Sequence, residues 1–99
     1  MISRQWRGIV KKSEASRYIS HLRTDTFPQL SGIPGFIDAS ILRRDAPEGV
    51  EFLVVTRWQS IEAIQKFAGA DVEQAVVPES AQAMMVRYDQ TVAHYEVVE

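Results

Sequence analysis

The sequence of 99 residues contains no cysteine. Disulfide bonds, thiolate metal ligands and cysteine nucleophiles are therefore excluded, and the absence agrees with a reducing compartment. The sequence also lacks any apolar run long enough for a signal peptide or a bilayer-spanning segment. We therefore expect a cytoplasmic protein that is neither exported nor inserted into a membrane.

The chain has no excess of positive charge either. Its formal net charge is -2, and its arginines are spread along the sequence, so no basic run attracts phosphate groups. The two histidines, His21 and His94, are too few and too far apart in sequence to predict a metal site. We therefore expect no nucleic acid partner and no metal ion.

The composition otherwise fits an ordinary folded domain. Hydrophobic residues make up 45% of the chain and charged residues 24%, which argues against disorder. A chain of 99 residues is also too short for two ordinary cores. We therefore assign residues 1–99 to a single domain.

Hydrophobic spacing alternates along the chain between strand and helix periods. Runs of β-forming residues predict strands at residues 2–10, 36–45, 50–58 and 91–98. Apolar residues at helical spacing predict helices that follow Ser13, Ser60 and Pro78, the first of them bending or ending near Pro28. The apolar positions of the last helix are Ala81, Met84, Met85 and Tyr88. This order predicts an α+β class, with an antiparallel sheet in a ferredoxin-like βαββαβ arrangement plus an extra helix.

The third predicted strand is apolar on both faces. Phe52 and Val54 point to one side of the sheet, whereas Leu53 and Val55 point to the other. The helices cover only one side, so the other needs a second layer, and in a chain this short that layer is another copy of the chain. The pattern therefore predicts a homodimer.

Two motifs carry a resemblance to a known family. They are the turn Ile33-Pro34-Gly35-Phe36 and the strand that ends in Trp58-Gln59-Ser60 before a helix. Together with weaker matches over most of the chain, they resemble the antibiotic biosynthesis monooxygenase family of the dimeric α/β-barrel superfamily. The resemblance implies a homodimer whose sheets pack face to face, with a pocket in each subunit between sheet and helices.

The family includes oxygenases that use neither metal nor flavin on polycyclic phenols, and haem-degrading relatives. Their catalysis is attributed to an asparagine and a tryptophan together with an arginine or a histidine, respectively. Trp58 matches the tryptophan, but the chain contains no asparagine, and Phe67 stands where the resemblance implies a haem-ligating histidine. The resemblance therefore favours a cofactor-independent monooxygenase acting on an aromatic or quinol-like small molecule, and disfavours haem degradation.

Such an oxygenase needs a base and a donor that stabilises the substrate anion. His94 and His21 are the candidate bases because imidazoles titrate near neutral pH. Arg4 is the first candidate donor, and Arg43 and Arg57 are the alternatives. Trp58 completes the predicted catalytic set. The predicted walls of the substrate pocket are Trp6, Tyr88, Tyr95 and Met84.

Each of these residues also has a structural interpretation. His94 fits a half-buried histidine on an edge strand, His21 fits a solvated helix position, and the tryptophans and Met84 fit core positions. Two other functions stay open for the same reason. One is a non-catalytic dimer that binds a small ligand or acts in stress, and the other is an isomerase or lyase that transfers protons on this fold. The sequence leaves open whether the chain is an enzyme.

Overall fold

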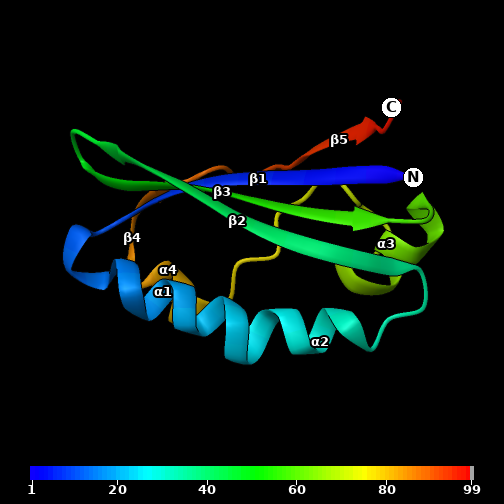
Figure 1. The fold of residues 1–99 in the computed structure, drawn as a ribbon, viewed down its shortest axis with the longest axis horizontal. Coiled ribbons are helices and arrows are strands. Elements are labelled where there is room, and N and C mark those ends of the chain that lie inside the picture. Colours follow the sequence, from blue (N-terminus) through cyan, green and yellow to red (C-terminus); the bar gives the residue numbers. More distant parts are fainter. Residues whose placement is uncertain (99) are drawn as a thin grey trace.

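The structure of the chain, a computed structural model, describes residues 1–98 and is built on one antiparallel sheet. β1 and β3 are central, β2 flanks β3, and β4 and β5 pair with successive parts of the other edge of β1 (Figure 1). The strands are β1 (Ile2–Val10), β2 (Phe36–Ala46), β3 (Gly49–Trp58), β4 (Met85–Tyr88) and β5 (Ala93–Glu96). The order confirms the predicted α+β, ferredoxin-like arrangement with the first and third strands at the centre.

The helices cover one side of this sheet. A long helical rod runs beneath the strands, and α3 lies at the end of the sheet where both chain termini are found (Figure 1). The helical elements are η1 (Lys12–Glu14), α1 (Ala15–His21), η2 (Leu22–Thr26), α2 (Phe27–Ser31), α3 (Ile61–Ala68) and α4 (Glu79–Gln82). Within residues 1–98, no helix is long and apolar enough to span a bilayer.

The predicted start of the first helix is wrong, and of the two outcomes predicted at Pro28, a bend or an end, the end is wrong. Ser13 lies within η1, and α1 begins after Glu14 without a side-chain cap. The rod also continues through Pro28 to Ser31. The π-helical turn η2 interrupts the α-helical hydrogen-bond pattern just before Pro28, and a new α-helix, α2, begins at Phe27. Pro28 therefore lies in the first turn of α2, where a missing backbone N–H is tolerated.

The extra helix is much shorter than predicted. α4 ends at Gln82, and residues Met85–Tyr88 form β4 instead of continuing the helix. The backbone of this segment pairs with β1 from Gly8 to Val10, so tertiary pairing overrides apolar spacing that happened to match a helix. The prediction of α3 is confirmed, because Ser60 Oγ accepts a hydrogen bond from the Ala63 N–H at 3.2 Å.

Two apolar clusters lie between the sheet and the helices. One gathers around Phe52 of β3 and Tyr18 of α1. The other gathers around Trp58 and Ile64, which have no exposed surface. Together they attach the helical rod and α3 to the same face of the sheet, which leaves that face covered and the other face bare.

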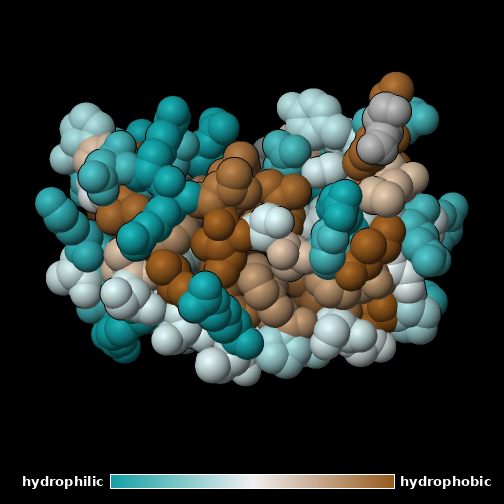
Figure 2. Space-filling view, viewed as in Figure 1, coloured by the Kyte–Doolittle hydropathy of each residue, from teal (hydrophilic) through white to brown (hydrophobic). Residues whose placement is uncertain are grey.

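The uncovered face of the sheet carries apolar side chains. Leu53 and Val55 are half-buried there, and Leu42, opposite Leu53, keeps 48% of its surface exposed. Tyr95 of β5 belongs to the same face and is 56% exposed. Figure 2 shows apolar side chains gathered over the middle of β2 and β3, with hydrophilic ones around them.

The turn before β2 requires a glycine, and this gives a test of the fold. Gly35 has φ +97°, and a Cβ added there would lie 2.5 Å from Ala63 Cβ on α3. We expect Gly35→Ala to lower the free energy of unfolding by about 1–3 kcal/mol from backbone strain alone, with the clash adding to it. Urea titration measures the change.

The matched control is Gly32→Ala, at the C-terminal end of the helical rod. Gly32 has φ -82° and the nearest atom to an added Cβ is 3.7 Å away. This variant is expected to be as stable as the parent chain or slightly more stable. Equal destabilisation by the two substitutions would contradict the described turn.

Candidate functional site

A cavity lies between the helical rod and the covered face of the sheet. The space inside it that admits a water-sized molecule is about 70 Å³, and the whole depression, including its mouth toward solvent, reaches about 580 Å³. The smaller value is well below the roughly 300–1,000 Å³ of pockets for drug-sized ligands. A ligand with several fused rings therefore has to occupy the mouth as well.

The cavity wall is mostly apolar and comes from four parts of the chain. The strands contribute Arg4, Trp6, Val54 and Thr56, and the helical rod contributes Tyr18, His21, Leu22, Thr26, Phe27 and Leu30. Phe67 of α3 and Ala81 of α4 close two sides. The segment between α3 and α4 covers the remaining side with Val76, Val77 and Pro78, next to Val92.

Arg4 is the charged residue of this wall and is only 5% exposed. Its Nη1 donates to the Val72 carbonyl at 2.5 Å, its Nη2 donates to the Gln74 carbonyl at 3.2 Å, and its guanidinium lies 5.7 Å from the Phe67 ring centre. Arg4 forms no ion pair with a carboxylate of residues 1–98. Burial lowers the pKa of Arg4 to about 10, so at neutral pH the cavity has a cation held by neutral groups.

His94 stands opposite Arg4 across the β1–β5 pair. Arg4 Nη1 and His94 Nε2 are 3.1 Å apart. Because a guanidinium only donates, Nε2 accepts the hydrogen bond from Arg4, and the imidazole of His94 is therefore neutral. Burial, then the charge of Arg4, lower the pKa of His94, while Glu73 raises it. His94 is not among the cavity-lining residues and instead orients Arg4.

His21 lies on α1 and does line the cavity, with 11% of its side chain exposed. Its ring stacks on the Tyr18 ring at 6.3 Å between centres, and its Nε2 lies 3.4 Å from Thr26 Oγ1. Its Nδ1 is 3.8 Å from a carboxylate oxygen of Asp25 at the surface. The structure therefore places His21 beside the cavity, between a carboxylate on the outside and an aromatic wall on the inside.

The two tryptophans have different positions. Trp6 lines the cavity, packs over Gly8, and donates from Nε1 to the Asp89 carbonyl at 2.9 Å. Trp58 has no exposed surface and is not among the lining residues; its Nε1 donates to Thr56 Oγ1 at 2.9 Å. Trp58 thus does not contact the cavity itself but fixes the side chain of Thr56, which does.

The other predicted residues lie around or away from the cavity. Met84 is buried in the cluster beside it, and Tyr88 packs on Trp6 with ring centres 6.2 Å apart. Tyr95 lies on the opposite face of the sheet. Arg57 lies on that opposite face too, where it pairs with Asp38, and Arg43 is exposed on the edge strand β2.

Several lining residues were not among the predicted site residues. Thr56 carried a signal, because it is a polar residue in an apolar strand on the side that faces the helices. Tyr18 lies at helical spacing between Ala15 and Leu22, and a phenol on the apolar face of a helix is a second signal. Val76 and Val77 carried none, because their segment has neither strand nor helix periodicity and is placed by the hydrogen bonds of Arg4.

Comparison with known proteins identifies the family of this chain. The sequence model described as antibiotic biosynthesis monooxygenase matches residues 1–84. The chain belongs to this family. Comparison with curated protein sequences gives no significant match.

Several solved structures share the fold of this family member, although their sequences have low identity to it. A variant of MhuD with two manganese protoporphyrin IX molecules in each active site is 21% identical, with a TM-score of 0.72 over 100% of this chain and 96% of that one. SnoaB, a cofactor-independent oxygenase from Streptomyces nogalater, is 16% identical, with a TM-score of 0.61 over 99% and 93%. A dimeric ferredoxin-like protein from an uncultured marine organism is 16% identical, with a TM-score of 0.59 over 99% and 94%.

The cavity of this family member does not fit a metalloporphyrin. Phe67 stacks on Trp58 with ring centres 6.2 Å apart, so an aromatic ring, not an imidazole, occupies the wall at α3. Within residues 1–98, no three histidine, cysteine, aspartate or glutamate side chains are grouped so that they could hold a metal ion.

The contact between Arg4 and His94 predicts a loss of stability in acid. The pKa of His94 in the folded chain lies below its ordinary 6.5, so below that pH the unfolded chain binds the proton more readily. The free energy of unfolding therefore falls as pH drops from 6.5 to the lower folded value, and is fully present above 6.5. Urea titrations at about pH 5 and pH 8 measure this.

The matched control is His94→Gln, which keeps an acceptor for Arg4 but does not titrate. All other groups titrate in both chains, so the pH dependence of the parent minus that of the variant isolates His94. We expect the parent chain to lose more stability in acid than the variant. The same pH dependence in both would show that the histidine is not held against Arg4.

Proposed function

We propose that this family member is a cofactor-independent monooxygenase that acts on an aromatic or quinol-like small molecule in the cavity. The supporting observation is that Arg4, a buried cation without a carboxylate partner among residues 1–98, lies in the wall of an aromatic and aliphatic cavity that His21 also lines. A buried guanidinium surrounded by neutral acceptors favours an anionic group on the ligand. The family membership and the fold shared with SnoaB support the same reaction class.

In this proposal His21 is the base and Arg4 stabilises the anion. His21 is preferred to His94 because it lines the cavity, whereas His94 Nε2 already accepts from Arg4. His94 and Trp58 are positioning residues that act through Arg4 and Thr56, respectively. Trp6 provides a flat wall against which an aromatic ring packs.

The reaction balances with molecular oxygen as the sole co-reactant. His21 removes a proton from an activated ring CH₂ or hydroxyl group, and the resulting anion gives its electrons to oxygen. One oxygen atom enters the substrate as a new carbonyl, and the other leaves as water with the two hydrogens that the substrate has lost, both from the CH₂ group or, for a phenol, one from the hydroxyl group and one from the ring carbon that is oxidised. Arg4 lowers the energy of the anion while the covered cavity keeps bulk water away.

The proposal predicts oxygen consumption with anthrones or dihydroxynaphthalenes. We expect His21→Gln to lower kcat by about 10²–10⁴-fold, as loss of a general base does. His94→Gln, which keeps an acceptor for Arg4, is expected to cost much less. An oxygen electrode measures the rates, and product analysis shows whether a carbonyl has formed.

Two outcomes would overturn this assignment. If the parent chain consumes no oxygen with any of these substrates yet binds them, the chain is a binding protein. If the substrate is converted without oxygen, the chain is an isomerase or lyase. A larger loss in His94→Gln than in His21→Gln would exchange the roles of the two histidines.

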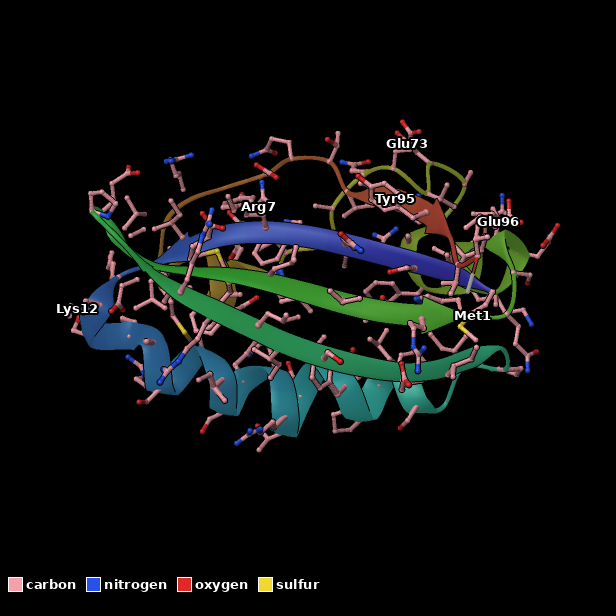
Figure 3. All side chains as sticks on the ribbon, turned by 45° about the horizontal axis from the view of Figure 1, so that its top comes forward. Met1, Arg7, Lys12, Glu73, Tyr95 and Glu96 are labelled. Carbon is pink, nitrogen blue, oxygen red and sulfur yellow. The ribbon has the colours of Figure 1, made fainter. Side chains whose placement is uncertain are left out.

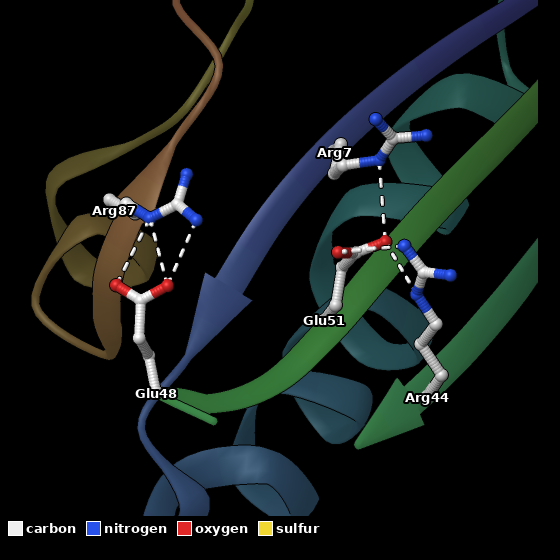
Figure 4. Close-up of polar contacts among 5 residues, drawn as sticks. All are labelled: Arg7, Arg44, Glu48, Glu51 and Arg87. Atoms are coloured by element: carbon white, nitrogen blue, oxygen red, sulfur yellow. Dashed lines mark hydrogen bonds and ion pairs between the residues drawn. The ribbon is translucent and has the colours of Figure 1, made fainter. Parts of the chain in front are cut away.

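We also propose that a second copy of the chain covers the bare face of the sheet. Leu42, Leu53, Val55 and Tyr95 form an apolar centre there. A charged cluster lies toward the hairpin end, where Glu51 is 3.4 Å from Arg7 and 3.1 Å from Arg44 (Figure 4). An apolar centre with a charged rim is typical of an interface, and Figure 3 shows Arg7 and Tyr95 on this same face.

A charge placed in this apolar centre is expected to dissociate the dimer. Leu42→Glu buries a carboxylate in the proposed interface, so sedimentation should show a shift from dimer to monomer at micromolar concentration. The control is Val76→Glu, which alters a residue of similar exposure, 47% against 48%, on the cavity side of the sheet. A monomeric parent chain would refute the proposal.

A cytoplasmic location and a single domain over residues 1–99 stay proposals. The lack of cysteine supports the first. The common sheet, to which strands from the first and the last part of the chain contribute, supports the second.

A further inference from the structure

Tyr18 is a buried phenol whose hydroxyl has no hydrogen-bond partner among residues 1–98. The residue is 3% exposed and lines the cavity. Burial alone raises the pKa of its hydroxyl well above the ordinary value, with no hydrogen bond contributing. Every fully buried side-chain oxygen or nitrogen of the described residues has a partner, so the Tyr18 hydroxyl must reach open space, and the space that it lines is the cavity.

The rest of Tyr18 is fixed by packing. Its ring meets the Phe52 ring edge-on at 5.1 Å, stacks on His21 at 6.3 Å, and lies 6.5 Å from Trp6. The ring cannot turn to find another partner without breaking these contacts. A rigid donor without an acceptor in a largely apolar cavity is incomplete until a ligand supplies one.

We propose that the Tyr18 hydroxyl selects the substrate by donating a hydrogen bond to a neutral ring oxygen. The proposal rests on the proposed function and narrows its substrate class to aromatic or partly reduced bicyclic molecules with a ring carbonyl or ether oxygen. Because the phenol stays protonated at neutral pH, Tyr18 donates and does not act as the base. Arg4 and Tyr18 then divide the recognition, Arg4 binding charge and Tyr18 binding a neutral oxygen.

The test compares two ligands that differ only in this oxygen. 1-Tetralone and tetralin share a bicyclic skeleton, but only the first has a ring carbonyl. We expect the parent chain to bind 1-tetralone more tightly than tetralin, and Tyr18→Phe to lose about three- to tenfold in affinity for 1-tetralone, the effect of one neutral hydrogen bond. Affinity for tetralin should not change, because phenylalanine keeps the ring contacts.

Calorimetric titration of both chains with both ligands gives all four affinities. Unchanged tetralin binding shows that the variant is folded with its cavity intact. Equal affinity of parent and variant for 1-tetralone, or no binding of either ligand to the parent chain, would overturn the assignment of Tyr18. Because the readout is binding, it stays valid if no substrate of the chain consumes oxygen, and so separates this proposal from the proposed reaction.

Discussion

The antiparallel pairing of β1 with β3 is the constraint on which the rest of the structure depends. The two strands pair along all of β1, from Ile2 opposite Trp58 to Val10 opposite Val50. Since side chains alternate between the faces of a strand, this register places Arg4, Trp6 and Thr56 on the covered face and their neighbours on the bare one. A slip of one residue would exchange the cavity wall for the exposed face. The cavity wall and the bare face are thus two consequences of one register.

Arg4 connects this sheet to the segment that closes the cavity. It is buried at the centre of the sheet, and its hydrogen bonds to the carbonyls of Val72 and Gln74 hold a segment that has no helix or strand of its own. The same side chain is oriented by His94 and contacts Phe67. The side chain proposed to bind an anion therefore also helps to shape the cavity. Substitutions of Arg4 are expected to affect structure and binding together.

Sequence patterns were informative where local chemistry decides the structure, and misleading where pairing between distant segments decides it. Ser60 was predicted as a helix cap because its hydroxyl reaches a backbone N–H three residues away. Residues 85–88 matched a helix by spacing, yet form β4 because the free edge of β1 offers backbone partners. Pro28 was expected to bend or end a helix. The helix does not end there, because Pro28 follows a π-helical turn and lies in the first turn of α2, where its missing backbone N–H is tolerated.

The same division separates the site residues. The sequence by itself determined the chemical inventory: no thiol, two imidazoles, and a central strand that is apolar on both faces, which follows from composition and from the two-residue period of a strand. It also carried the family resemblance. Only the tertiary structure decided that His21 lines the cavity while His94 contacts Arg4, that Trp58 lies behind Thr56, and that the Tyr18 hydroxyl has no partner among residues 1–98. Those roles depend on which side chains from distant segments meet in space, and neither residue type nor spacing along the chain fixes that.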